Sequence, residues 1–206
     1  MATTDVYLIR HGETHANLDQ LFCGHSETAL TPLGIAQAKA AGRRLAGVEF
    51  AAAYASDLSR AADTARHALD GRDVPLTLEP RLREMFYGDW EALPGKQLEE
   101  SHRDLMRDFF QCRAPAPGGE TVTELRARTS EAVRDIVARH RGSAVMVVSH
   151  GNAMMALMAE LLGLPHEATW SFAFDNTSLT RLHFSKSNRL TLFGLNDTSH
   201  TVGLGL

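Results

Sequence analysis

The sequence contains little cysteine and no long apolar run. Its two cysteines, Cys23 and Cys112, form neither a C-x-x-C pair nor a spacing typical of metal ligands. So few thiols are typical of a reducing compartment rather than of a disulfide-stabilised secreted protein. No stretch approaches the roughly 20 apolar residues that a membrane span requires, and residues 1–5 lack the basic start of a signal peptide. These absences predict a cytoplasmic protein with no membrane partner.

Lysine is also scarce, and the chain has no dense basic run. The lysines are Lys39, Lys96 and Lys186, so arginine carries most of the positive charge and a single arginine is not by itself evidence for a binding site. The formal net charge of −4 argues against a nucleic-acid partner. With 44% hydrophobic and 22% charged residues, the 206-residue chain has the composition of an ordinary globular domain.

Short apolar runs alternate with amphipathic segments along the chain. The expected strands are residues 5–10, 50–55, 74–78 and 144–149, followed by a closing pair at 178–184 and 189–195. The expected helices are residues 32–45, a helix capped by Ser56 or Asp57 that ends near residue 69, and residues 97–110, 120–141 and 152–162. This alternation indicates an α/β protein with a mainly parallel sheet, covered by helices on both sides and antiparallel at one edge. We expect one domain, residues 1–206, with residues 82–119 as an insertion over the sheet edge that forms a cap over the functional site.

Two His-Gly pairs directly follow two of these expected strands. Arg10-His11-Gly12 follows the first strand, and His150-Gly151 follows the strand at 144–149. Because ligands of open α/β sheets bind beyond the carboxyl ends of the strands, both pairs are expected at one crevice. Arginine offers a planar fork for phosphate oxygens, and its charge disfavours protonation of a neighbouring histidine. One such histidine would more often be a hydrogen-bonded turn residue, but two pairs favour anion chemistry.

Arg60 conflicts with its expected position in the first turn of a helix. A cation there opposes the positive end of the helix dipole, at a cost of about 0.3–1 kcal/mol. The conflict disappears if the guanidinium and the helix N-terminus both face a bound anion, since local rules are most often broken at functional sites. The alternative is a solvated arginine paired with Asp57 or Asp63, and position alone does not separate the two.

Glu84 is one of three acids in the aromatic segment 83–91, together with Asp89 and Glu91. Aromatic surroundings can favour a protonated carboxyl, which could give its proton to a leaving oxygen. The alternative is that Glu84 is an ordinary surface acid, and the segment alone does not rank it clearly above the other two.

These residues together suggest phosphoryl transfer through a phosphohistidine. His11 would attack phosphorus, while Arg10, Arg60 and His150 would hold the phosphoryl oxygens. An acid would protonate the leaving alcohol, and water would then cleave the phosphohistidine. Arginines and histidines supply the positive charge in this scheme, so no metal and no cofactor are expected.

Seven segments in chain order resemble the motifs of the histidine phosphatase superfamily, also called phosphoglycerate mutase-like. They are Leu8-Ile9-Arg10-His11-Gly12-Glu13-Thr14 with Asn17, Leu30-Thr31-x-x-Gly34-x-x-Gln37-Ala38, Ser56-Asp57-Leu58-Ser59-Arg60-Ala61-x-x-Thr64-Ala65, Leu82-x-Glu84-x-x-x-Gly88-x-Trp90-Glu91, Pro117-Gly118-Gly119-Glu120-Thr121, Ser149-His150-Gly151 and Leu195-Asn196-Asp197-Thr198. Any one of them is modest evidence, but seven in order over nearly the whole chain are specific.

The resemblance implies a three-layer α/β/α sandwich and a role for each matching residue. It implies that His11 is the phosphorylated residue and that Glu84, rather than its acidic neighbours, is the proton donor. It implies a phosphate pocket made of Arg10, Arg60 and His150, assisted by Asn17 and the Gly151 amide. Cys23-Gly24 stands where the family often has Gln-Gly, in a loop expected to contact substrate.

The short segment 82–119 lacks the tyrosine- and arginine-rich insertion of the cofactor-dependent mutases. The absence of this insertion favours the phosphatase branch, similar to broad-specificity and alpha-ribazole phosphatases. Met155 stands at a position where the family often has an arginine that can anchor a distal anionic group. We therefore predict a metal-independent phosphomonoesterase of the histidine acid type, acting on a small phosphorylated metabolite. The alternatives are a cofactor-dependent phosphoglycerate mutase, of which Asn152 is typical, and a non-catalytic phospho-ligand-binding protein. The sequence names no substrate and leaves open whether the chain forms a homodimer.

Overall fold

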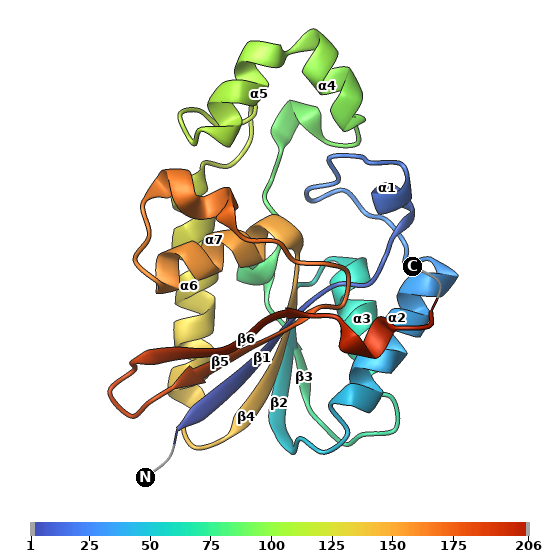
Figure 1. The fold of residues 1–206 in the computed structure, drawn as a ribbon, viewed down its shortest axis with the longest axis vertical. Helices are drawn as coiled ribbons and strands as arrows, with labels where there is room; N and C mark the ends of the chain where they lie inside the picture. The colour runs from blue at the N-terminus through green and yellow to red at the C-terminus, as the bar shows by residue number, and fades with distance from the viewer. Residues whose placement is uncertain (1–2, 205–206) are drawn as a thin grey trace.

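A computed structural model describes residues 3–204, and a six-stranded sheet lies at the centre of this part of the chain (Figure 1). The strands are β1 (Thr4–Arg10), β2 (Phe50–Ala55), β3 (Leu76–Leu78), β4 (Ala144–Ser149), β5 (Leu179–Phe184) and β6 (Leu190–Asp197), in the order β3-β2-β4-β1-β5-β6. The pairs β1–β4, β2–β4 and β2–β3 are parallel, whereas β5 pairs antiparallel with both β1 and β6. The predicted mainly parallel sheet with an antiparallel edge is confirmed.

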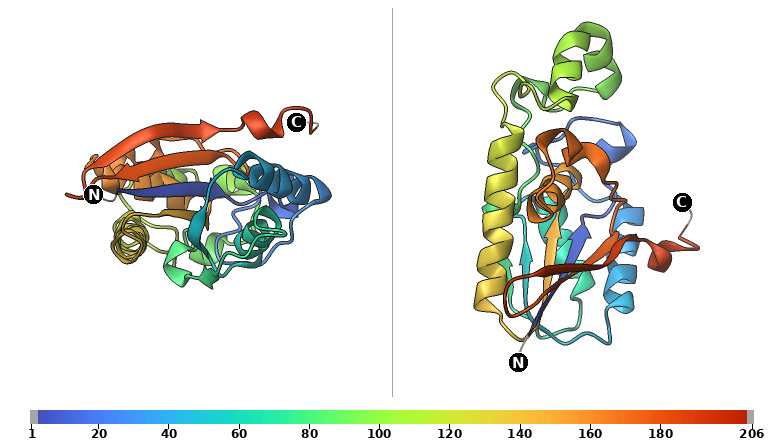
Figure 2. Two further views of the ribbon diagram at one scale, coloured as in Figure 1. Left: turned by 90° about the horizontal axis from the view of Figure 1, so that it is seen from below. Right: turned by 60° about the vertical axis from the view of Figure 1, so that its left-hand side comes forward.

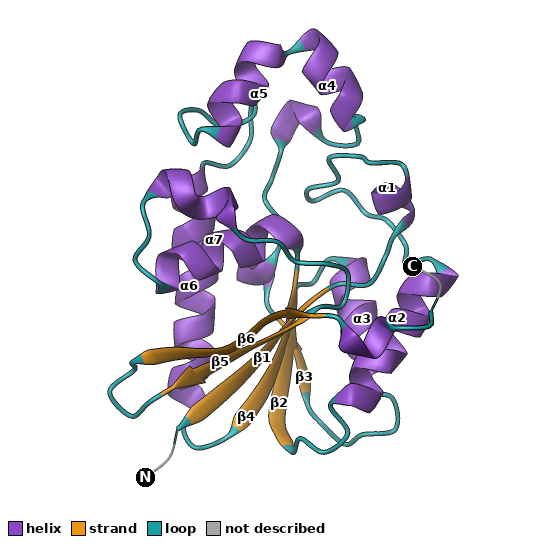
Figure 3. Ribbon diagram, in the orientation of Figure 1, coloured by secondary structure: helices purple, strands orange, loops and turns teal. Residues whose placement is uncertain are grey.

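Helices cover both faces of this sheet, as Figures 2 and 3 show. One face packs against α6 (Val122–Arg139) and α7 (Gly151–Leu161), and the other against α2 (Pro32–Arg44) and α3 (Ser59–Ala68). Along β1, Val6 and Leu8 belong to the first core, and Ile9 belongs to the second, since successive strand residues point to opposite faces. The predicted three-layer α/β/α sandwich is confirmed. The shorter elements are α1 (His15–Leu18), η1 (Pro80–Leu82), η2 (Gly88–Trp90), α4 (Gly95–Ser101), α5 (Arg103–Phe110), η3 (His166–Ser171) and η4 (Ser199–Thr201).

Two expected helices differ from the structure. α3 begins at Ser59 with Leu58 as its N-cap, so the predicted cap at Ser56 or Asp57 is wrong. The Asp57 carboxylate binds the guanidinium of Arg83 instead, at 2.6 and 2.7 Å. The helix expected over 97–110 is interrupted at His102, which ends α4 and precedes α5.

The segment 82–119 forms a core of its own beside α7. Met85, Trp90 and Phe109 pack there with Ala153 and Ala156 of α7. Figure 1 shows α4 and α5 above α7, beyond the carboxyl ends of the strands. The segment therefore lies on the side of the predicted site rather than over the sheet edge, and its role as a cap stays a prediction.

The loop after β1 presses closely against the start of α2, and glycine is required at the contact. A Cβ on Gly34 would overlap the carbonyl oxygen of Glu13, whereas a Cβ on Gly47 would meet no atom of residues 3–204 within 4 Å. We expect Gly34→Ala to lower the free energy of unfolding by about 1–3 kcal/mol, and Gly47→Ala to change it by at most about 1 kcal/mol. Urea denaturation of both variants measures this difference, and equal transition midpoints would show that the contact relaxes freely.

Candidate active site

A cavity of about 370 Å³ opens where β1 and β4 end. The candidate residues that line it come from six separate segments and are Arg10, His11, Asn17, Cys23, Gly24, Arg60, Glu84 and Gly151. The remaining candidate, His150, lies behind them with its ring centroid 5.1 Å from that of His11. The fold thus brings all nine predicted residues together, since parallel β1 and β4 deliver both His-Gly pairs to the same edge.

The imidazole of His11 is held in one tautomer. Its Nδ1 lies 2.7 Å from the carbonyl oxygen of Gly12, so Nδ1 carries the proton and Nε2 keeps its lone pair. The Gly12 amide in turn donates to Thr64 Oγ1 of α3 at 2.9 Å. Burial, together with the charges of Arg60 and Arg10, holds the pKa of His11 well below its ordinary value. His11 is therefore a neutral histidine with an unprotonated Nε2, which is the form that a nucleophile needs.

His150 is held in the opposite tautomer. Its Nδ1 accepts a hydrogen bond from Arg60 Nε at 3.2 Å, so Nε2 carries the proton. Burial and the neighbouring Arg60 charge hold the pKa of His150 well below its ordinary value, so the ring is neutral. The two histidines therefore present different groups, a lone pair from His11 and an N–H donor from His150.

Two buried donors at this site have no acceptor among residues 3–204. They are Nε2 of His150 and Nε of Arg10, whose Nη1 donates to the Phe174 carbonyl oxygen at 2.6 Å. Leaving a buried donor unpaired costs about 1–3 kcal/mol, so such groups call for an explanation. An anion bound at this point would supply both with acceptors.

Arg60 is almost completely buried, at 2% exposure, and spans two parts of the site. Besides its bond to His150, it donates through Nη1 to the carbonyl oxygen of Ser26 at 3.0 Å and through Nη2 to that of Gly24 at 2.6 Å. One guanidinium therefore fixes both the tautomer of His150 and the backbone of residues 24–26.

The alternative interpretation of Arg60 as a solvated arginine is wrong. Asp57 pairs with Arg83, and Asp63 pairs with Arg66 at 2.6 Å, so neither predicted acidic partner binds Arg60. The position of Arg60 in the first turn of α3 is explained instead by its three acceptors, which are His150 Nδ1 and the carbonyl oxygens of Gly24 and Ser26.

Glu84 differs in surroundings from the sequence expectation. Its carboxylate faces the N-terminus of α7 rather than a cluster of aromatic rings. Oε1 accepts from the amides of Met85 at 2.8 Å and Ala153 at 3.0 Å, and Oε2 accepts from the amide of Asn152 at 3.2 Å. Glu84 is the acid of segment 83–91 that lines the cavity, whereas Glu91 binds the backbone of His25 at 2.6 Å.

The smaller candidate residues have structural contacts at the cavity wall. Asn17 Oδ1 accepts from the Thr14 amide at 3.1 Å, and so holds the chain just after His11. Cys23 Sγ donates to the Ser26 carbonyl oxygen at 3.1 Å, and burial raises the pKa of this thiol. A Cβ on Gly151 would lie 3.5 Å from Arg10 Nε, so glycine leaves room in front of one of the two unpaired donors.

With this geometry in place, the comparison with known proteins is decisive. Residues 6–198 match the family model of the histidine phosphatase superfamily (branch 1). The chain belongs to this superfamily. The adenosylcobalamin/alpha-ribazole phosphatase of Escherichia coli (strain K12) is 37% identical over 179 residues, which cover 82% of this chain and 85% of that protein.

The chain is also similar to members of the superfamily that carry other names. A probable phosphoglycerate mutase GpmB of Yersinia pestis (strain Pestoides F) is 35% identical over 202 residues, covering 95% of this chain and 94% of the relative. The solved structure of Bacillus stearothermophilus YhfR superposes with a TM-score of 0.91 at 34% identity, covering 96% of this chain and 98% of that one. Membership of the histidine phosphatase superfamily, with phosphatases among the relatives, supports a phosphatase activity.

Sequence reasoning missed one segment of this histidine phosphatase site. Residues 174–177, which precede β5, hold the backbone around the predicted nucleophile. The carbonyl oxygen of Phe174 binds Arg10, and Asn176 Nδ2 donates to the carbonyl oxygen of His11 at 3.0 Å and to Asn17 Oδ1 at 3.3 Å. The segment carries no charge pattern or motif that would have singled it out.

The described part of this superfamily member shows neither a metal-binding cluster nor a membrane-spanning helix. Residues 3–204 contain no group of three or more histidine, cysteine, aspartate or glutamate side chains arranged to hold a metal ion. Among the same residues, every helix is too short or too polar to cross a membrane.

Acidification below about pH 6.5 is expected to destabilise this histidine phosphatase. In the unfolded chain His11 and His150 titrate near 6.5, whereas in the folded protein burial lowers both pKa values well below that. Below pH 6.5 the unfolded state therefore binds more protons than the folded state. The free energy of unfolding is thus greatest above pH 6.5, and it falls as the pH is lowered from 6.5 towards the folded-state pKa values. Each histidine contributes at most about 1.4 kcal/mol per pH unit. Burial shifts the pKa of His25 and His200 in the same direction.

Urea denaturation at a series of pH values tests this expectation. His150→Gln removes one of the titrating groups, so its free energy of unfolding should depend less steeply on pH below 6.5. An unfolding free energy that stays constant from about pH 7.5 to 5.5 would contradict the neutral state assigned to the two rings.

Proposed function

We propose that this protein is a metal-independent phosphomonoesterase that acts through a phosphohistidine on a small phosphorylated metabolite. The proposal rests on one observation: a neutral His11 with a free Nε2 lone pair lies beside two buried donors, on Arg10 and His150, that have no acceptor among residues 3–204. These groups supply a nucleophile and the hydrogen-bond donors that a phosphoryl group needs.

In the first step, His11 Nε2 attacks the phosphorus of the ester. The N–P bond forms while the bond from phosphorus to the ester oxygen breaks. The proton of the Glu84 carboxyl passes to that oxygen, so that the product leaves as an alcohol. Arg10, Arg60 and His150 stabilise the charge on the three non-bridging oxygens.

In the second step, a water molecule attacks the phosphorus of phosphohistidine. Glu84, now a carboxylate, accepts a proton from this water as the new P–O bond forms. The N–P bond breaks, His11 regains its neutral ring, and inorganic phosphate leaves. Both steps use the same acid and the same oxygen-binding groups, so one site serves both half-reactions.

The cavity wall beyond the predicted site residues favours a phosphatase over a phosphoglycerate mutase. This wall is made of uncharged side chains, those of Thr14, Gln20, Leu21, Phe22, Tyr87, Phe110, Asn152 and Met155. The cations among the lining residues are Arg10 and Arg60, and both are at the predicted phosphate position. A mutase has to bind a substrate carboxylate as well as a phosphate, and a bisphosphate in addition. A phosphate ester with an uncharged organic part matches this wall better.

Hydrolysis of an aryl phosphate in excess chelator tests the proposal. We expect full activity under chelation, and rapid acid-free quenching should trap a phosphorylated protein whose modified peptide contains His11. Loss of activity on chelation would exclude a metal-independent reaction. Phosphate exchange between phosphoglycerate isomers, dependent on added bisphosphate, would instead favour the mutase, and absence of both reactions would favour a phospho-ligand-binding protein.

A further inference from the structure

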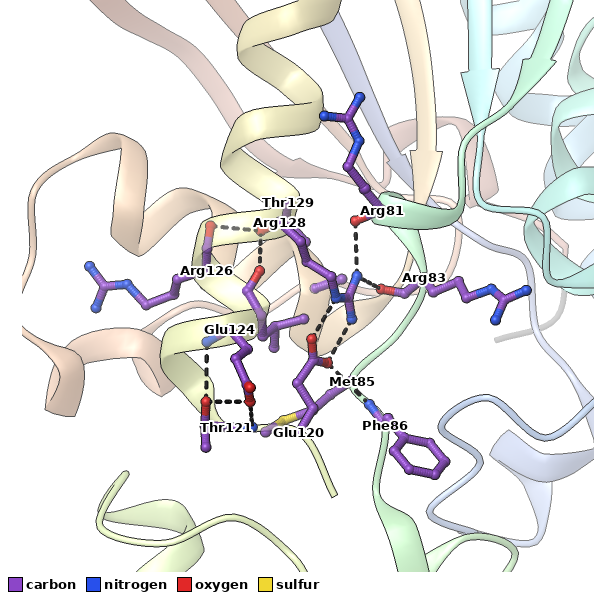
Figure 4. A network of polar contacts seen from close by, with 12 residues as sticks. Arg81, Arg83, Met85, Phe86, Glu120, Thr121, Glu124, Arg126, Arg128 and Thr129 are labelled. Carbon is purple, nitrogen blue, oxygen red and sulfur yellow. Dashed lines mark hydrogen bonds and ion pairs between the residues drawn. The ribbon is translucent and has the colours of Figure 1, made fainter. Parts of the chain in front are cut away.

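A third arginine, Arg128, lies close to the candidate acid but outside the cavity that Arg10 and Arg60 line. Arg128 belongs to α6, and all five of its guanidinium N–H groups have acceptors. Figure 4 shows its contacts with Glu120, Arg81 and Arg83. Nε and Nη2 bind both oxygens of Glu120, at 2.6 and 2.7 Å. The other three N–H groups donate to main-chain carbonyl oxygens, those of Arg81 at 2.9 Å, Arg83 at 2.7 Å and Glu84 at 2.8 Å.

Glu120 extends this contact further along the same segment. Its Oε2 accepts from the Phe86 amide at 3.3 Å, and its own amide donates to the Phe86 carbonyl oxygen at 2.9 Å. The ion pair is largely shielded, with side-chain exposures of 20% for Arg128 and 13% for Glu120. A planar, bidentate pair of this kind has a fixed geometry, which a flexible surface pair lacks.

The main chain that carries Glu84 is therefore held residue by residue. Ser149 Oγ donates to the Leu82 carbonyl oxygen at 2.8 Å, so every carbonyl oxygen from residue 81 to residue 84 accepts from a donor on another element. The Glu84 carbonyl oxygen has a second donor, His25 Nε2 at 2.9 Å. From this fixed backbone, the Glu84 carboxylate reaches the amides of Asn152 and Ala153 at the start of α7.

We propose that Arg128 is a positioning residue for Glu84, and that its guanidinium sets the distance from the acid to the leaving oxygen. The inference rests on the proposed role of Glu84 as proton donor. Arg128 does not line the cavity, so its effect would reach the reaction through the backbone of residues 81–84. Proton transfer requires the acid within about 2.6–3.2 Å of the leaving oxygen, so a small displacement of this backbone is enough to impair it.

The sharpest test compares two esters whose leaving groups differ. The leaving group of an aryl phosphate is a stable phenolate, which hardly needs a proton from Glu84. The leaving group of an alkyl phosphate is an alkoxide, which does need that proton. We expect Glu84→Gln to lower kcat/KM for the alkyl ester by about a hundredfold or more and to affect the aryl ester much less. Arg128→Lys keeps the charge but lacks the planar fork, and we expect about a tenfold loss that is confined to the alkyl ester.

Arg126→Lys is the matched control. Arg126 lies on the same helix, is more buried, with 5% side-chain exposure against 20% for Arg128, and also binds a carboxylate, Glu160 at 3.0 Å. Its other acceptors are the Leu164 carbonyl oxygen and Thr169 Oγ1, which do not line the cavity. We expect its thermal unfolding temperature to fall and its ratio of aryl to alkyl kcat/KM to stay at the wild-type value. Retained aryl activity in Arg128→Lys shows that this variant folds.

The double variant Glu84→Gln with Arg128→Lys decides between positioning and general support of the fold. If Arg128 acts through Glu84, the second substitution costs nothing further on the alkyl ester. An additive loss, an equal loss on both esters, or unchanged kinetics of Arg128→Lys would overturn the inference. If Glu84→Gln itself shows no dependence on the leaving group, the proposed acid role fails and the inference about Arg128 fails with it. If Glu84→Gln shows the dependence and Arg128→Lys does not, only the inference about Arg128 fails.

Discussion

Replacing His11 with alanine is expected to lower kcat for an aryl phosphate by about ten-thousandfold or more. His11 Nε2 is the nucleophile in the proposed reaction, and the buried donors around it can bind a phosphate but cannot form the N–P bond. Steady-state hydrolysis assays on purified variant and wild type, both in chelator, measure the effect. Phosphate should still bind to the variant, because Arg10, Arg60 and His150 remain.

His15→Ala is the control for this variant. His15 is exposed and begins α1, four residues after His11. We expect its kcat to remain within about twofold of the wild type, since surface substitutions of this kind change stability little. Substantial turnover by His11→Ala would sink the phosphohistidine mechanism, even if the superfamily assignment stands.

Arg60→Lys is expected to lower kcat/KM by about a hundredfold. Arg60 binds three acceptors at once, on His150 and on the carbonyl groups of Gly24 and Ser26. Lysine keeps the charge, but a compact ammonium cannot reproduce a rigid fork that spans these groups. Without the hydrogen bond from Arg60, the His150 ring could exchange tautomers. Its Nε2 would then no longer always carry the proton that it donates.

The matched comparison is Arg66→Lys on the same helix. Arg66 is exposed and pairs with Asp63 three residues earlier, a kind of ion pair worth about 0.2–1 kcal/mol. We expect wild-type kinetics and a thermal unfolding temperature within a few degrees of the wild type. Similar kinetic losses in both variants would show that the helix, and not the buried fork, is what the reaction depends on.

The fold could be predicted because its strands carry a strong local signal. The runs at 50–55 and 144–149 are apolar on both faces and match β2 and β4 residue for residue. Helix ends were less predictable, because they depend on distant partners. The predicted cap of α3 is wrong because the Asp57 carboxylate binds Arg83 instead. The single helix predicted over 97–110 is wrong because the chain turns at His102, between α4 and α5.

The site was predictable where a local rule is broken or a strand ends. His11 and His150 follow strands, and Arg60 opposes a helix dipole, so each stands out in the sequence. Glu84 owed its rank over Asp89 and Glu91 to family resemblance, and its actual surroundings, the amides at the start of α7, could not be read from its neighbours. The roles of all these residues stay predictions until the variants are measured.

Residues that act only through tertiary contacts gave no signal. Arg128 is one of many arginines in the chain, and nothing near it in sequence reveals that it binds the backbone of residues 81–84. The same holds for Asn176, whose amide binds the carbonyl group of His11 across 165 positions. Pairings at such separations follow from the packing of the layers and not from local pattern.

The positions that line the cavity differ in how far they can be substituted to change the substrate preference. The carbonyl oxygens of Gly24 and Ser26 accept hydrogen bonds from Arg60, so changes in that loop are expected to disturb the proposed phosphate binding together with selectivity. Phe110 at the end of α5, with 49% of its surface exposed, and Met155 on α7 line the cavity through side chains that form no hydrogen bond with the predicted catalytic residues of the described chain. Libraries confined to these two positions should therefore yield enzymes with new preferences and undiminished chemistry.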